Sequence, residues 1–117
     1  MTRYAKRIVA VCLFCTLVLW AVTFDGSKDV TAAGTAEALS ATEVRCVWVT
    51  VQAKQGNANN VFVGASTVAD GRGAELDALD SVTYPPVGKS YFYDLSTIYV
   101  DAETNGDGVT FWCERRY

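Results

Sequence analysis

The sequence contains no histidine, and it has only one methionine and two prolines in 117 residues. Histidine is the side chain that most often serves as a general base near neutral pH, and it is the commonest metal ligand. The sequence has no nucleophile-elbow motif and no Ser-x-x-Lys motif that could replace it. We therefore predict that the protein is not an enzyme and that it has no catalytic residue, no metal site and no cofactor.

Long stretches of helical periodicity are also missing beyond residue 24. Val, Thr and Tyr are plentiful there, and Gly, Asn and Pro interrupt short apolar runs at regular spacing. This pattern predicts an all-β fold, namely a small antiparallel β-sandwich of six to eight short strands preceded by one N-terminal hydrophobic helix. The length leaves room for one domain.

Basic residues are scarce in the same part of the chain. Beyond residue 24 the chain has seven Lys and Arg residues and all thirteen of its acidic residues, which gives this part a net charge of −6. A domain of this charge without a basic stripe is not expected to bind nucleic acid or to dock on an anionic membrane surface.

Charged residues are absent from an apolar segment that begins at Ile8 and ends at Phe24, after the basic residues Arg3, Lys6 and Arg7. Its composition indicates an exported protein with either a cleaved signal peptide or a single uncleaved membrane anchor. We favour the anchor because the segment is long and the small-residue cleavage pattern is poor. The predicted organisation is a signal or anchor over residues 1–24, a linker over 25–29 and a β-sandwich over 30–117.

Two further cysteines, Cys12 and Cys15, lie within this apolar segment as a C-x-x-C pair. A redox motif needs an accessible thiolate, so we interpret these cysteines as small apolar residues of the segment.

The clearest strand signal is residues 44–54, which we predict to be the central strand. One face is strongly apolar by period-two alternation, and its members are Val47, Val49, Val51 and Ala53. A Gly/Asn cluster connects this run to residues 60–65, and the pair is predicted to form a hairpin. A second hairpin is expected between residues 97–102 and 109–114, with Asn105 and Gly106 in its turn.

Short pieces complete the sandwich. We expect strands near residues 30–33 and 36–39, the latter with a helix over 35–41 as the alternative. Residues 74–79 are expected to form a short strand or a turn, and residues 81–84 a further strand.

Cys46 and Cys113 fall in the central and last strands, and two such cysteines in an exported domain are expected to pair. The alternation opposes this pairing, because Cys113 shares the parity of the core-facing Phe111 whereas Cys46 has the opposite parity to Val47 and Val49. A disulfide needs Cα atoms within about 7 Å. Either a β-bulge shifts one strand, or both thiols stay free.

Clustered aromatic side chains form the candidate contact surface. The four in the loop around the Pro-Pro pair are Tyr84, Tyr91, Phe92 and Tyr93. Such a cluster can bind a partner, or alternate members can fill one end of the core. Trp48 is a further candidate if its face of the strand is open.

The acidic run that contains Asp101, Glu103 and Asp107 superficially suggests a calcium loop. An EF-hand loop needs an acid at its twelfth position, and here that position is Trp112. A turn at Asn105-Gly106 is the better interpretation, and a loose, non-EF calcium site formed by Asp101, Glu103 and Asp107 is the alternative.

Four motifs follow one another in an order that resembles a small β-sandwich module of tailed-phage and prophage virion proteins. They are VFVGASTV (61–68), LDSVT (79–83), DLSTIYVDA (94–102) and GDGVTF (106–111). The resemblance spans Val30 to Tyr117 and implies a non-enzymatic head-fibre, decoration-like or tail-associated protein. The implied partners are other virion or envelope proteins, including further copies of the chain, and a membrane if residues 8–24 remain attached. The alternative is a bacterial secreted or envelope-anchored binding module.

Overall fold

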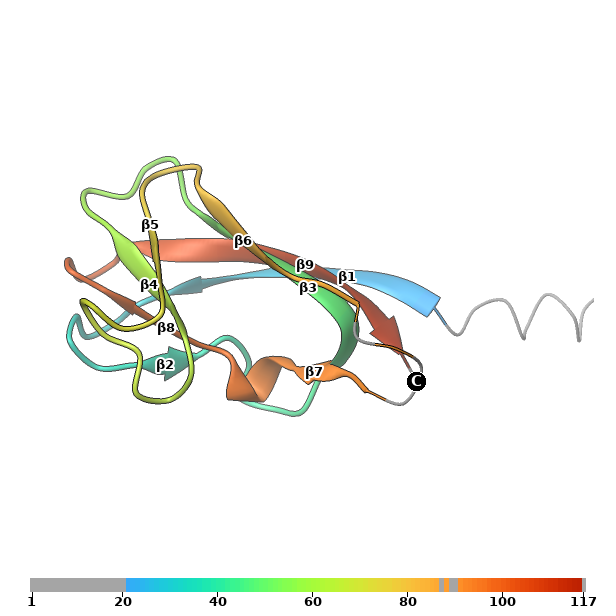
Figure 1. The fold of residues 1–117 in the computed structure, drawn as a ribbon. Helices are drawn as coiled ribbons and strands as arrows, with labels where there is room; N and C mark the ends of the chain where they lie inside the picture. Colours follow the sequence, from blue (N-terminus) through green and yellow to red (C-terminus); the bar gives the residue numbers. More distant parts are fainter. Residues whose placement is uncertain (1–20, 87, 89–90, 117) are drawn as a thin grey trace, which may run out of the picture.

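The computed structural model describes residues 21–86, 88 and 91–116. These residues form two packed antiparallel β-sheets and contain no α-helix, which confirms the predicted all-β class (Figure 1). The helix expected near the N-terminus, and Cys12 and Cys15 with it, lie outside the described residues. Within the described part, no helix has the length and apolar character needed to cross a membrane.

The first sheet has the strand order β1-β9-β3-β6, and the short β7 also pairs with β3. Its strands are β1 (Ala21–Asp29), β3 (Arg45–Ala53), β6 (Ser81–Tyr84), β7 (Tyr93–Asp94) and β9 (Gly108–Arg116). β3 and β9 form the centre of this sheet, so residues 44–54 are the central strand that the alternation predicts.

The second sheet has the order β2-β8-β4-β5. Its strands are β2 (Glu37–Ala38), β4 (Val61–Gly64), β5 (Ala74–Leu76) and β8 (Tyr99–Ala102), and the one-turn 3₁₀ helix η1 (Leu95–Thr97) precedes β8. The inner faces of the two sheets enclose one core. The core residues contributed by strands β3, β4, β8 and β9 are Cys46, Val49, Val51, Ala53, Val61, Val63, Val100, Ala102, Val109, Phe111 and Cys113.

The domain begins earlier than the sequence predicts. β1 covers residues 21–29, so the expected linker at 25–29 is wrong, and the last residues of the apolar segment belong to the sandwich. β1 pairs with β9 along its whole length, and Phe24 stacks on Phe111 with ring centroids 6.5 Å apart. β1 is an edge strand with one polar, exposed face, and this mixed composition makes it resemble a linker.

The first strand expected, near residues 30–33, is also wrong. Val30 is buried, and the residues after it form a turn in which the N–H of Thr35 donates to the carbonyl of Ala32 (3.1 Å). Gly34 has φ +91°, a backbone conformation that suits glycine. The short piece at 36–39 is confirmed as β2.

Neither predicted hairpin forms, because both connections cross between the sheets. β3 and β4 belong to different sheets, and so do β8 and β9. The turn at Asn105-Gly106 is present, with Gly106 at φ +89° and the N–H of Asp107 donating to the carbonyl of Thr104 (3.2 Å). Turn residues identify a reversal of the chain, but they do not determine whether the next strand stays in the same sheet.

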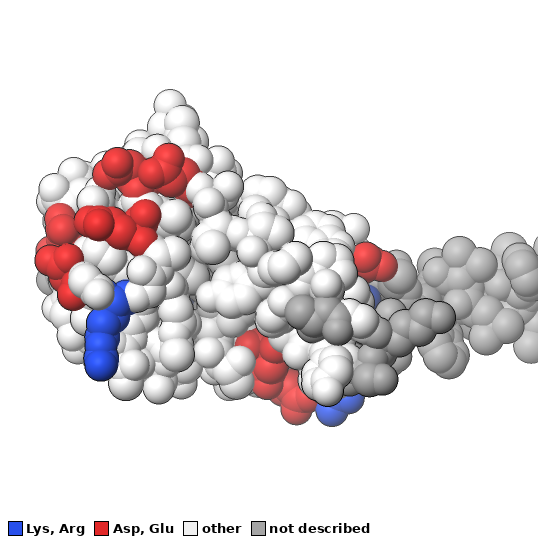
Figure 2. Space-filling model, in the orientation of Figure 1, with Lys and Arg blue, Asp and Glu red and all other residues white. Residues whose placement is uncertain are grey.

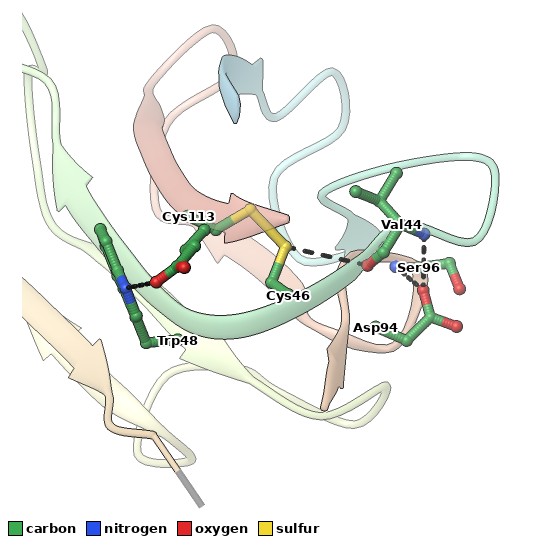
Figure 3. Close-up of a disulfide and its surroundings, with 7 residues drawn as sticks. Val44, Cys46, Trp48, Asp94, Ser96 and Cys113 are labelled. Carbon is green, nitrogen blue, oxygen red and sulfur yellow. Dashed lines mark hydrogen bonds between the residues drawn. A yellow bond between two sulfur atoms is a disulfide. The ribbon is translucent and has the colours of Figure 1, made fainter. Parts of the chain in front are cut away.

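The predicted disulfide between Cys46 and Cys113 is present, with Cα atoms 5.8 Å apart (Figure 3). The pairing of β3 with β9 shifts between Cys46 and Val49, so that Val47 and Trp48 together lie opposite Glu114. This β-bulge adds one residue to β3 and reverses its alternation, which turns Cys46 inward. Both cysteines are completely buried.

Candidate functional site

One end of the sandwich carries the aromatic residues that the sequence suggests as a contact surface. A single row of pairing crosses four strands there, from Val22 on β1 through Arg115 on β9 and Cys46 on β3 to Tyr93 on β7. We call this the aromatic end. In Figure 1 the beginning of β1, the end of β9 and β7 lie toward this end.

Tyr84 and Tyr93 use their rings to close the core at the aromatic end. Both are half-buried against the core, and their rings meet edge to face with centroids 5.4 Å apart. The hydroxyl of Tyr93 donates to the carbonyl of Pro85 (2.6 Å). Burial raises the pKa of Tyr84, and the neighbouring Tyr93 raises it further. These two residues therefore contribute to the packing of the core and are not part of an exposed contact surface.

Tyr91 and Phe92 differ from the two tyrosines because they are exposed. The exposed fraction is 69% for Tyr91 and 43% for Phe92. The guanidinium of Arg45 lies 4.7 Å from the centroid of the Phe92 ring, a cation–π distance, and it also pairs with Glu43. The aromatic end therefore offers apolar rings beside a cation.

Trp48 lies apart from these rings, on the outward face of the first sheet. Its half-buried indole donates from Nε1 to a carboxylate oxygen of Glu114 (3.2 Å), the residue opposite the bulge (Figure 3). Thr50 continues this face and shares a 3.0 Å hydrogen bond with the Thr83 hydroxyl. The five contact residues predicted from the sequence thus lie in three different places. Tyr84 and Tyr93 pack against the core, Tyr91 and Phe92 are exposed, and Trp48 lies on the outward face of the first sheet.

The opposite end of the sandwich is acidic. Figure 2 shows the largest group of acidic side chains on the visible face at this end, over β4, β5 and β8 of Figure 1. Ligand atoms of Asp70, Glu75 and Glu103 lie within 4.8 Å of one another, a spacing that could hold a cation. All three residues are exposed, and acidic groups of this kind are common without an ion.

Asp101 and Asp107, which the sequence places in the same acidic run, hold loops instead. Asp101 is 2% exposed, and its Oδ1 accepts the N–H groups of Gly34 (2.9 Å) and Ala102 (2.8 Å). Asp107 accepts the N–H groups of Ala58 and Asn59, each at 2.9 Å. Their carboxylates replace backbone partners where the chain crosses between sheets.

Sequence reasoning missed Asp94, which anchors the chain near the aromatic end. Its carboxylate caps η1 by accepting the N–H of Ser96 (2.9 Å), and it also accepts the N–H of Val44 (3.2 Å) (Figure 3). Burial raises the pKa of Asp94, but these hydrogen bonds and Arg45 outweigh it, and the net shift is downward. Asp is a preferred helix N-cap residue, and the position of Asp94 directly before the short turn at Leu95–Thr97 is the signal that could have identified it.

The fold and these surfaces define a small, disulfide-linked, two-sheet β-sandwich with chemically different ends. Comparison with protein-family models, with curated proteins and with solved structures found no match to this chain.

Proposed function

We propose that the protein is an exported, non-enzymatic β-sandwich module with a structural or attachment role. The specific form that the sequence resemblance implies is a virion-associated protein of a phage or prophage. The observation that carries the proposal is the buried disulfide between Cys46 and Cys113. Structural disulfides form and persist in oxidising compartments outside the cytoplasm, and small exported domains use them to supplement a small core.

The edge strand β1 supports a structural role in an assembly. It is nine residues long and pairs only with β9, so its other edge has no strand partner among the described residues. The edge strands of the second sheet, β2 and β5, have two and three residues. A long edge of unpaired backbone groups is suited to pairing with another chain. We propose that copies of the protein associate through β1.

Counting free thiols in cells tests export and shows whether the N-terminal segment is retained. The full chain is expressed, denatured without reductant and treated with a maleimide mass tag. The number of tagged cysteines, out of four in the chain, depends on whether the domain has formed its disulfide and whether the N-terminal segment is retained. Two tags, on Cys12 and Cys15, are expected if the domain is exported and the N-terminal segment is retained.

Four tags contradict the proposal, because they would show a reduced domain, and export would be wrong. No tags would show an exported domain from which the N-terminal segment had been removed. A C12S/C15S variant provides the control, because it should lose both tags without reduction and gain two after reduction.

The virion role is tested separately by fractionation of a producing culture. Co-purification of the chain with capsid proteins in density-gradient particles supports the virion role. Recovery only in the cell envelope would support the bacterial module instead.

A further inference from the structure

We propose that a hollow on the outward face of the second sheet binds an organic cation, namely an ammonium or guanidinium group carried on an aliphatic chain. Loops at residues 33–34 and 69–70 border this hollow, and Phe62, Asp101 and Glu103 also line it. We call it the acidic hollow. The proposal goes beyond the structural role described above, and it does not depend on export, on the N-terminal segment or on a virion.

The floor of the acidic hollow is a row of side chains that point away from the core. Phe62 on β4 pairs with Asp101 on β8 and with Glu75 on β5, so these three residues share one face of the second sheet. Val61 and Val63, on either side of Phe62, face the core. Phe62 is only 2% exposed although it faces outward, because the bordering loops stand over it. A ligand in the hollow therefore contacts an aromatic ring.

Asp101 supplies a carboxylate oxygen that is open to the hollow. The residue is 2% exposed, and the N–H groups of Gly34 and Ala102 both donate to its Oδ1. No described residue donates a hydrogen bond to its Oδ2. Among the described residues no fully buried side-chain oxygen lacks a partner, so Oδ2 is accessible from the hollow that Asp101 lines. A buried side chain with an unused acceptor atom of this kind is suited to a bound hydrogen-bond donor.

The rim of the acidic hollow carries negative charge that nothing in the described part of the chain neutralises. Asp70 and Glu103 line the hollow, and their ligand atoms lie within 4.8 Å of each other and of Glu75 (Figure 2). Arg72, two residues from Asp70, forms no ion pair with any described residue. The ion pairs that are present use other acids, namely Asp29, Glu37 and Glu43. The charge of the hollow is therefore complementary to a cationic ligand.

The size and lining of the hollow favour an organic cation over a metal ion. Calcium needs about six to eight oxygen ligands in direct contact, whereas the close group here has three exposed carboxylates and does not include Asp101. The hollow has a volume of about 470 Å³, far more than one ion occupies, and part of its lining is apolar. Directly paired residues have Cβ atoms about 5 Å apart, so one cationic group can contact the Phe62 ring and also donate to Asp101.

An amide NMR titration of the isotope-labelled full chain in zwitterionic detergent tests the site. The probes are the N-acetyl methylamides of lysine and arginine, and that of norleucine is the neutral control. The amide signals of Gly34 and Ala102 are the reporters, because both N–H groups bond to Asp101. We expect them to move several-fold further with a cationic probe than with the neutral control, along a saturating curve. Equal movement with all three compounds, or no movement, overturns the proposal.

Two substitutions locate the binding. Asp101→Asn removes the charge of the floor but can keep both N–H groups bonded to its amide oxygen, and Glu103→Gln removes a rim charge at an exposed position where folding is not at risk. Each should weaken binding of the lysine probe several-fold. Asp77→Asn is the matched control, because Asp77 is an exposed acid that does not line the hollow, and it should leave the affinity unchanged. Equal weakening in Asp77→Asn and Glu103→Gln would show attraction by net charge alone, and the site would be wrong.

Two further titrations identify the occupant. Lys and Arg side chains of a partner protein and free amines share the proposed chemistry. Tighter binding of the lysine and arginine probes than of free 1,5-diaminopentane supports a partner side chain, and the reverse order supports a free amine. Calcium chloride that moves the same signals and displaces the lysine probe would assign the hollow to a metal and overturn the proposal. None of these measurements reports on export or assembly, so their failure leaves the proposed function standing.

Discussion

Cys46 and Cys113 lie diagonally across neighbouring strands of one sheet, both facing the core, with Cα atoms 5.8 Å apart. Regular alternation would point Cys46 outward. The single extra residue in β3, opposite Glu114, turns the Cys46 side chain inward, so that it faces the core together with Cys113. The bulge therefore determines whether this domain can form its disulfide.

Deletion of Val47 should preserve the disulfide. Removing the extra residue makes β3 regular, and Cys46 then still faces the core because Trp48 alone lies opposite Glu114. Deletion of Thr50 lies outside the bulge and should instead shift the register of the beginning of β3 by one residue. This shift would move the Cys46 side chain from the core-facing to the exposed face of the strand. Mass-tag counting on both variants in the C12S/C15S background distinguishes them. Equal loss of the disulfide in both would show that the bulge does not set the facing of Cys46.

Removal of the disulfide by a C46A/C113A double substitution should strongly destabilise the domain. The bond joins residues 67 positions apart, and the chain-entropy model gives about 4 kcal/mol for a loop of this length. Denaturant unfolding of the full chain in detergent measures the loss. The C12S/C15S variant is the matched control and should unfold like the parent chain. A change below about 1 kcal/mol in the double variant would contradict the chain-entropy expectation.

The sequence predicts well those features that depend on alternation within one strand. β3, β4, β8 and β9 are all predictable because each buries a periodic apolar face. The crossings between sheets are not, because the contacts that direct them come from distant residues, such as Asp107 accepting the N–H groups of Ala58 and Asn59. β1 escapes prediction for a related reason, since an edge strand shows weak alternation.

The candidate surface is predictable only in part. The sequence identifies Tyr91 and Phe92 but cannot separate them from Tyr84 and Tyr93, because the direction of each ring depends on how β6 and β7 pair with β3. Val22 cannot be assigned to the surface from sequence at all, because its place in the row follows from the register between β1 and β9.

Gly26→Ala should weaken the attachment of β1 to the sandwich. A Cβ at Gly26 would lie 2.7 Å from the Phe111 ring, which occupies the space of the missing side chain. Overpacking of this kind costs about 1–3 kcal/mol. Thermal unfolding measures the change, with Gly56→Ala as control because a Cβ there meets no atom within 4 Å. A Phe111→Leu partner substitution should make Gly26→Ala less costly, and equal cost in both backgrounds would contradict the ring contact.

Asn substitutions should separate Asp101 from Asp107. Asp101 accepts both of its N–H groups on Oδ1, so the amide oxygen introduced by Asp101→Asn can retain both bonds, and this substitution should cost less than about 1 kcal/mol. Asp107 accepts Ala58 on Oδ1 and Asn59 on Oδ2. Asp107→Asn therefore places the NH₂ donor of the amide opposite a backbone N–H donor, and it should lower the free energy of unfolding by about 1–3 kcal/mol. Denaturant unfolding compares the two variants, and the reverse order would contradict these roles.

Glu37 should contribute to a loss of stability in acid. The N–H of Ala32 lowers the pKa of Glu37 from its ordinary value of 4.5, and Lys28 and the N–H of Thr31 lower it further, although burial acts in the opposite direction. Because the folded pKa lies below the unfolded one, the contribution is fully present above the unfolded pKa and is lost as the pH falls through the folded pKa. Unfolding free energies measured from pH 6 to pH 2 should therefore fall most steeply below about pH 4.5. Glu37→Gln cannot titrate and should make this decline shallower, while Lys28→Gln, which keeps the carboxylate and both N–H donors, should shift it only slightly toward higher pH. An unchanged acid profile in Glu37→Gln would show that other carboxylates determine the acid stability of the domain.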